Sequence, residues 1–130
     1  MRPNRGSQGH SQRQLRAGEL IRHALADILL RGDTGDPQLE KLALSVVEVQ
    51  MSPDLRIATV YVRGLESGQD QLVLAALERN KKYIRGLLAP RVDMRYMPDI
   101  RFRLDTSLQY AQKIDDLLAN PKVASDLKHS

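Results

Sequence analysis

Residues 46–62 read VVEVQMSPDLRIATVYV, two apolar runs separated by a short stretch that contains proline and aspartate. In the second run Ala58, Val60 and Val62 lie at every second position, which is typical of a strand with one buried face. The proline presets the backbone for a tight turn. The stretch therefore predicts a β-hairpin. Its two strands are expected over residues 42–51 and 55–63.

The segments on either side of the hairpin predict one more helix and one more strand. Over residues 13–31 apolar side chains, Leu20 among them, recur at helical spacing and would form a buried face. Over residues 100–105 apolar and polar residues alternate, so that Phe102 is expected to point inward and Asp105 outward.

The stretch 69–89 has helical periodicity but is interrupted in the middle by Arg-Asn-Lys-Lys. Because Asn80 is a poor helix former, the stretch predicts either two helices or one helix bent near 80–82. Tyr83 lies on the apolar side of the second half and is expected in the core. A proline ends the helix, and residues 91–98 are expected to be extended.

The remaining segments complete one domain. Thr106 and Gln109 match a capping box and predict a last helix. Residues 1–12 have no apolar residue after the first and predict a flexible basic arm, with organelle import as a lesser alternative. A domain is expected over 13–119 and a flexible tail over 120–130. The order α-β-β-α-α-β plus a C-terminal helix predicts an α+β fold, a three-stranded sheet with helices packed on one face.

The composition excludes several classes of function. The 130 residues contain no cysteine, which excludes disulfides, zinc–thiolate sites and thiol catalysis. The three histidines lie far apart in the sequence and no phosphate-binding glycine loop is present, so no metal, cofactor or catalytic site is expected. No apolar run approaches the roughly 20 residues that a membrane helix needs. The sequence therefore predicts a cytoplasmic protein that is not an enzyme.

Basic residues gather in two zones, although the net charge is only +4. Residues 1–31 hold six arginines against two acidic residues, and residues 79–95 hold six basic residues against one. Such zones indicate a polyanionic partner, most often nucleic acid, with solvated helix faces as the alternative. Because aromatic residues make up only 4%, contacts to the RNA backbone are favoured over base stacking. The residues predicted to bind RNA are Arg79, Lys81, Lys82, Arg85, Arg91 and Arg95, with Arg13, Arg16 and Arg22 on the first helix.

The interrupted helix predicts the most specific site. KH domains bind nucleic-acid backbone at a joint between two helices, through a G-x-x-G loop. Here the joint has no glycine, and Lys81 and Lys82 would contact phosphates as point charges. An exposed helical kink with solvated lysines is the alternative interpretation.

The hairpin also resembles that of bacterial ribosome-binding factor A proteins. Three further segments agree with the family in order and spacing. They are the first helix, Tyr83-Ile84-Arg85, and Met94-Arg95-Tyr96-Met97-Pro98-Asp99-Ile100-Arg101-Phe102. The resemblance extends over residues 12–119.

This resemblance implies a type II KH-like α+β fold and a monomeric, non-enzymatic assembly factor. Members carry an Ala-x-Gly kink at the helix joint, where this chain has Asn80, Lys81 and Lys82. A protein of this kind would bind the free 30S small subunit, assist late 16S rRNA maturation near the decoding region and 5′ end, and leave before translation. An assembly GTPase that helps release the factor and support for growth in the cold are also implied.

Two other classes of function stay open. A protein–protein adaptor would dock a partner on a sheet or helix face, and its basic arm would be incidental. A small hydrolase is the weakest alternative, because the sequence contains no catalytic constellation. Salt dependence separates RNA binding from the adaptor, since contacts to about five phosphates predict a log–log slope of roughly −3 to −5.

Overall fold

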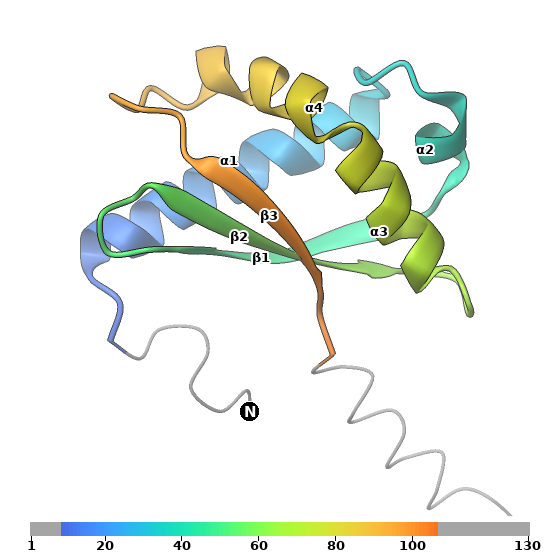
Figure 1. The fold of residues 1–130 in the computed structure, drawn as a ribbon, viewed down its shortest axis with the longest axis horizontal. Coiled ribbons are helices and arrows are strands. Elements are labelled where there is room, and N and C mark those ends of the chain that lie inside the picture. Colours follow the sequence, from blue (N-terminus) through green and yellow to red (C-terminus); the bar gives the residue numbers. More distant parts are fainter. Residues whose placement is uncertain (1–8, 107–130) are drawn as a thin grey trace, which may run out of the picture.

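A three-stranded sheet with helices against one face makes up residues 9–106, the part that a computed structural model of the chain describes (Figure 1). The elements are α1 (Gln12–Arg31), α2 (Pro37–Lys41), β1 (Leu44–Met51), β2 (Ile57–Gly64), α3 (Asp70–Arg79), α4 (Lys81–Leu88), a 3-10 turn (Ala89–Arg91) and β3 (Asp99–Leu104). The predicted α+β class and the α-β-β-α-α-β order are confirmed. The short helix α2 begins where the sequence predicts a loop.

The sheet is mixed, with β2 in the centre. β1 and β2 form the predicted antiparallel hairpin, and β3 runs parallel to β2 on its other side. Val47 forms a bulge in β1, directly after the pair Val46–Val62. Because one extra residue resets the alternation, Val46 and Val49 are both buried although three positions separate them.

The core lies between the inner face of the sheet and the helices. Ala58, Val60 and Val62 on β2 are fully buried, as their alternation predicted, and Phe102 on β3 joins them. The residues between them, such as Thr59, lie on the other face of the sheet and are half-buried.

Helix α1 packs closely on β1. Ser11 caps the helix and forms a reciprocal capping box with Gln14, whose Nε2 also donates to the carbonyl of Met51 at 2.9 Å. Farther along, Gly18 lies against the backbone of Val49, and a Cβ at this position would overlap the Val49 carbonyl oxygen. The helix can pack this closely against the strand because the glycine at position 18 has no side chain.

Three side chains lie elsewhere than the sequence predicted. Tyr83 is 55% exposed, because it lies at the margin of the α4 face that Ile84 and Leu88 bury. Asp105 is only 2% exposed, because β3 ends at Leu104 and its alternation ends there too. Leu20 is exposed at the margin of the buried face of α1.

Several boundaries also differ from the prediction. Residues 91–98 form no strand: Arg91 ends the 3-10 turn, and β3 begins only at Asp99. Helix α1 begins at Gln12, inside the predicted arm. Residues 1–8 of that arm, the predicted last helix with Gln109 in its capping box, and the predicted tail lie outside the described residues.

Candidate nucleic-acid interface

The joint between α3 and α4 is built around Asn80. Its backbone N–H reaches the carbonyls of Ala76 and Leu77, both at 3.2 Å, where α3 ends. Its Nδ2 donates to the Ala76 carbonyl at 2.8 Å and to Oδ2 of Asp36 at 2.7 Å. Of the two predicted alternatives, two helices or one bent helix, the structure has two helices. An asparagine side chain holds the joint at the place where the resemblance implied a glycine-containing kink.

Asp36 connects this joint to α2. Its Oδ1 accepts from the backbone N–H of Gln38 at 2.9 Å, which caps α2, while its Oδ2 accepts from Arg79 at 2.8 Å and from Asn80. The hydrogen bonds from Asn80 and Arg79 hold the pKa of Asp36 far below its ordinary value. The sequence did not indicate this contact, because 44 positions separate Asp36 from Asn80.

The Asp36 carboxylate is expected to make stability depend on pH in the acid range. Because its pKa is lower in the folded chain than the ordinary 3.8, its contribution is complete above that value and is lost as the pH falls toward the folded pKa. Urea midpoints of the wild type and of Asp36→Asn should differ by a constant amount between about pH 7 and about pH 5. That difference should shrink at about pH 3, because there the unfolded wild type binds a proton at Asp36 while the folded chain still keeps the carboxylate.

Asp99→Asn is the matched control, since the Asp99 side chain is 64% exposed and lies 3.8 Å from Arg101. This variant should stay close to the wild type throughout the same pH series, because exposed ion pairs contribute little. If the urea midpoints of the wild type and of Asp36→Asn differ as much at about pH 3 as at about pH 7, the carboxylate does not have this role.

Five of the nine residues predicted to bind RNA make contacts within the chain. Four form ion pairs: Arg79 with Asp36, Lys81 with Glu78, Arg22 with Glu19, and Arg91 with Asp27. Arg85 instead donates to the carbonyl oxygens of Met97 at 2.8 Å and Pro98 at 2.9 Å, which fixes the segment ahead of β3 on α4. Because their donors already have acceptors, these five cations are less available to a phosphate than the remaining four.

The other four are Arg13, Arg16, Lys82 and Arg95. Within residues 9–106 none of these four forms an ion pair with another side chain. Lys82 is exposed in the first turn of α4, beside the joint. Arg13, Arg16 and Arg95 lie elsewhere and line one groove together with Arg56, which the sequence analysis did not select.

This groove lies between three segments that are far apart in the sequence. Arg13 and Arg16 come from the first turns of α1, Arg56 from the β1–β2 turn, and Arg95 from the link ahead of β3. The groove encloses about 460 Å³. In Figure 1 the start of α1 and the β1–β2 turn lie at one end of the sheet and α2 at the other.

The parallel pairing of β3 creates the groove. Asp99 at the start of β3 pairs with Ile57 at the start of β2, and its N–H donates to the carbonyl of Arg56 at 2.8 Å. The residues just ahead of β3, Tyr96 among them, are therefore placed beside the β1–β2 turn. Arg56 and Tyr96 were missed because no local pattern identifies the partner of a third strand. The sequence does contain one indication of this pairing. Two predicted helices separate β2 from β3, and parallel neighbouring strands need such a crossover connection.

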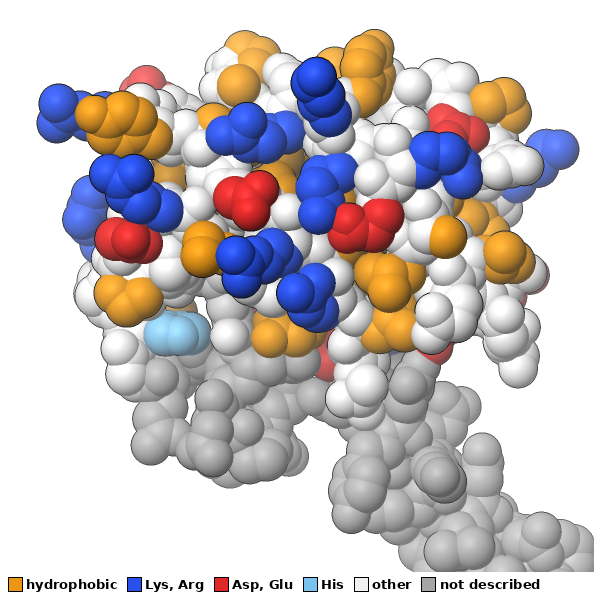
Figure 2. Space-filling model, in the orientation of Figure 1, with side chains coloured by type: hydrophobic (Ala, Val, Ile, Leu, Met, Phe, Trp, Pro, Cys, Tyr) orange, Lys and Arg blue, Asp and Glu red, His pale blue; other side chains and the backbone are white. Residues whose placement is uncertain are grey.

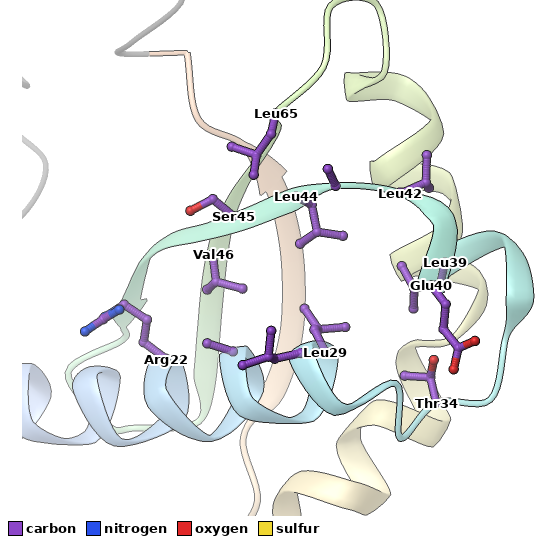
Figure 3. A pocket seen from close by; sticks show the side chains of 13 residues that line it. Arg22, Leu29, Thr34, Leu39, Glu40, Leu42, Leu44, Ser45, Val46 and Leu65 are labelled. Atoms are coloured by element: carbon purple, nitrogen blue, oxygen red, sulfur yellow. The ribbon is translucent and has the colours of Figure 1, made fainter.

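Arg22 lies on the other side of α1. Nine positions separate it from Arg13, which puts the two about 180° apart around a helix of 3.6 residues per turn. Arg22 lines a second hollow, of about 520 Å³, between α1 and β1. Figure 3 shows Leu29, Leu44 and Val46 pointing into this space. The lining is mostly apolar, so the hollow offers little to a polyanion.

Charge alone does not single out one surface. Figure 2 shows Lys and Arg side chains over much of one face, with acidic side chains among them. In the part of the chain that the structure describes, no cluster of three or more His, Asp or Glu residues could hold a metal ion. No helix within that part is long and apolar enough to span a bilayer.

Comparison with known proteins gives a consistent family. A sequence model described as Ribosome-binding factor A matches residues 13–118. The ribosome-binding factor A of Bradyrhizobium sp. strain BTAi1 is 52% identical over 119 residues, covering 92% of this chain and 86% of that protein. The protein of the same name from Brucella ovis is 52% identical over 126 residues, covering 96% and 84%.

Solved structures agree with the sequence comparison. The crystal structure of ribosome-binding factor A from Thermus thermophilus has a TM-score of 0.58 and 28% identity, covering 70% of this chain and 94% of that one. The solution structure of a putative ribosome binding factor A from Thermotoga maritima has a TM-score of 0.61 and 27% identity, covering 74% and 90%. Coordinates of the Thermus thermophilus protein fitted into the cryo-EM map of a 30S complex have a TM-score of 0.52 and 30% identity, covering 67% and 89%.

Proposed function

Because this chain belongs to the ribosome-binding factor A family, we propose that it binds the free 30S subunit and assists late maturation of 16S rRNA. The family match over residues 13–118 carries the proposal. The relative whose coordinates were fitted into the map of a 30S complex supports the same partner. Four basic residues without ion-pair partners among the described residues supply charge for contacts to an RNA backbone.

The mechanism that fits these surfaces is non-covalent. Lys82 at the joint and the arginines of the groove contact phosphates and favour one conformation of an immature RNA junction. Release follows when the mature RNA no longer presents phosphates in that arrangement. The joint itself is held by Asn80 and Asp36, so Lys82 projects from a fixed helix start. Binding therefore needs no order–disorder change at this point of the fold.

Further expectations accompany this role. The protein acts as a cytoplasmic monomer, performs no covalent chemistry, and is released with the help of an assembly GTPase. Its loss slows growth in the cold, when misfolded RNA junctions rearrange slowly. The resemblance of the sequence to the family implies each of these properties.

Sedimentation of the tagged protein through sucrose gradients of bacterial lysate tests the proposal. The protein should migrate with free small subunits and not with whole ribosomes, and the bound fraction should fall steeply with salt. Lys82→Glu should reduce the bound fraction several-fold, because it removes a phosphate contact and adds repulsion. Lys41→Glu is the matched control, since Lys41 is exposed on α2 and outside both surfaces.

The outcomes separate the site from the function. A Lys82→Glu variant that binds as well as Lys41→Glu would keep the small subunit as partner and remove the joint from the interface. Wild-type protein that stays at the top of the gradient at every salt concentration would contradict the proposed function. Binding that is insensitive to salt would favour the adaptor, because an apolar interface releases few counterions.

A further inference from the structure

The groove combines a cationic rim with an exposed aromatic ring. Tyr96 is 60% exposed. The guanidinium carbons of Arg95 and Arg56 lie 5.4 Å and 5.7 Å from the centre of its ring. Two cations this close stabilise the position of the ring through cation–π attraction. The ring is thus held at the surface and oriented, although no core packing covers it.

Part of the groove lining is apolar. Ala17 and Leu20 of α1 form this part, together with Leu55 and Met94. Leu55 has a φ of 60°, in the left-handed region that residues other than glycine rarely adopt. Apolar side chains of this kind contact the flat face of a nucleobase more favourably than they contact a phosphate.

The charges around the groove favour an anion. Four arginines line it, against the carboxylates of Asp54 and Asp93. Asp54 is occupied within the turn, where it accepts from the Ser52 hydroxyl at 2.7 Å and from the Arg56 backbone N–H at 3.1 Å. Its Oδ2 also lies 4.0 Å from Nε of Arg56, but both side chains are mostly exposed, so this ion pair is weak. The same two hydrogen bonds lower the pKa of Asp54, so it stays ionised in the turn. Arginine forks match the geometry of phosphate oxygens, which an equal number of lysines would not.

We propose that this groove binds single-stranded RNA, with an unpaired base stacked on Tyr96 and the adjoining phosphates held by Arg13, Arg16 and the arginines beside the ring. A paired base cannot reach the ring, because its faces are already stacked in the duplex. The site is separate from the helix joint. The low aromatic content favoured contacts to the RNA backbone over base stacking. The proposed site adds one stacked base to such contacts, because one exposed ring is enough for one base. The inference rests on the proposed function in taking RNA as the partner.

Fluorescence anisotropy with the full chain and a fluorescein-labelled single-stranded RNA of about eight nucleotides tests the site. Tyr96→Ala should weaken binding about tenfold, within the range measured for loss of one base stack. Tyr96→Phe should stay within about twofold of the wild type, because the ring is kept. Tyr83→Ala is the matched control, since Tyr83 is 55% exposed on α4 and does not line the groove.

Two results would overturn the inference. One is Tyr96→Ala binding the probe as tightly as Tyr83→Ala does. The other is displacement of the probe by an RNA duplex of equal length as efficiently as by the unlabelled single strand, because the bases of a duplex are not available to the ring.

Sucrose gradients with small subunits, run in parallel, test the proposed function separately from the groove site. Wild-type protein that migrates with small subunits but does not bind the single strand would remove the groove site and leave the proposed function standing. Protein that binds the single strand through Tyr96 but stays at the top of the gradient would support the groove site and contradict the proposed function.

Discussion

Replacing Gly18 with alanine is expected to lower the free energy of unfolding by about 2 kcal/mol or more, the range of overpacked sites. The new Cβ would overlap the carbonyl oxygen of Val49, which belongs to the backbone of β1 and cannot rotate away. Either α1 or β1 must move, and both carry core residues. The cost outweighs the gain of about 1 kcal/mol that alanine brings to a helix interior. Urea unfolding followed by circular dichroism measures the difference.

Gly86→Ala is the matched control for this experiment. Gly86 also lies inside a helix, α4, but a Cβ there meets nothing within 4 Å. The same chemical change is therefore expected to raise the free energy of unfolding by about 0.5–1 kcal/mol. Opposite signs at the two glycines would support the close approach of α1 to β1. A stabilised Gly18→Ala variant would show that α1 does not contact β1 as described.

The double variant Arg13→Glu/Arg16→Glu is expected to weaken binding to small subunits by about 100-fold or more. Each arginine loses a charge-assisted contact of roughly 1.5–3 kcal/mol, and two such losses exceed the 2.8 kcal/mol that corresponds to 100-fold. Folding should survive, because both residues lie near the start of α1, where acidic side chains interact favourably with the helix dipole. Thermal unfolding checks this, and salt-dependent co-sedimentation measures the binding.

Arg101→Glu/Arg103→Glu serves as the matched control, since it changes the net charge equally at two exposed positions on β3. Its effect should be much smaller and should vanish at higher salt, as expected for long-range repulsion. Equal losses in the two double variants would mean that overall charge controls the affinity. In that case the groove would lose its special role.

Local patterns were sufficient to predict the hairpin, β3 and the joint. Alternation identified the buried side chains of β2, and Asn80 interrupted the helical pattern where the helices separate. The same reasoning correctly placed Ile84 and Leu88 in the core, but it also placed Tyr83 there, which lies at the margin of their face. The bulge at Val47 could not be predicted, because one inserted residue does not change the composition of the strand.

The candidate site was predictable only in part. Arg13, Arg16 and Arg95 were selected by charge, but their convergence depends on β3 pairing parallel to β2. The separation of Arg22 from Arg13 could have been read from helical phase alone. Helical spacing also pairs Arg22 with Glu19 and Lys81 with Glu78, but no sequence pattern predicts the partners that lie far away along the chain. The contact of Arg79 with Asp36, 43 positions away, illustrates this.

The contact of Gln14 and Gly18 with β1, called here the α1–β1 seam, also affects solubility. Among residues 9–106, β1 is an edge strand that pairs with β2 alone, and a bare strand edge is a template for aggregation. Here Gln14 donates to the Met51 carbonyl, and Gly18 brings the helix backbone over the carbonyl of Val49. The helix thereby shields this half of the edge from strand addition by another molecule. Variants that loosen the seam should therefore precipitate during refolding at concentrations where the wild type stays in solution.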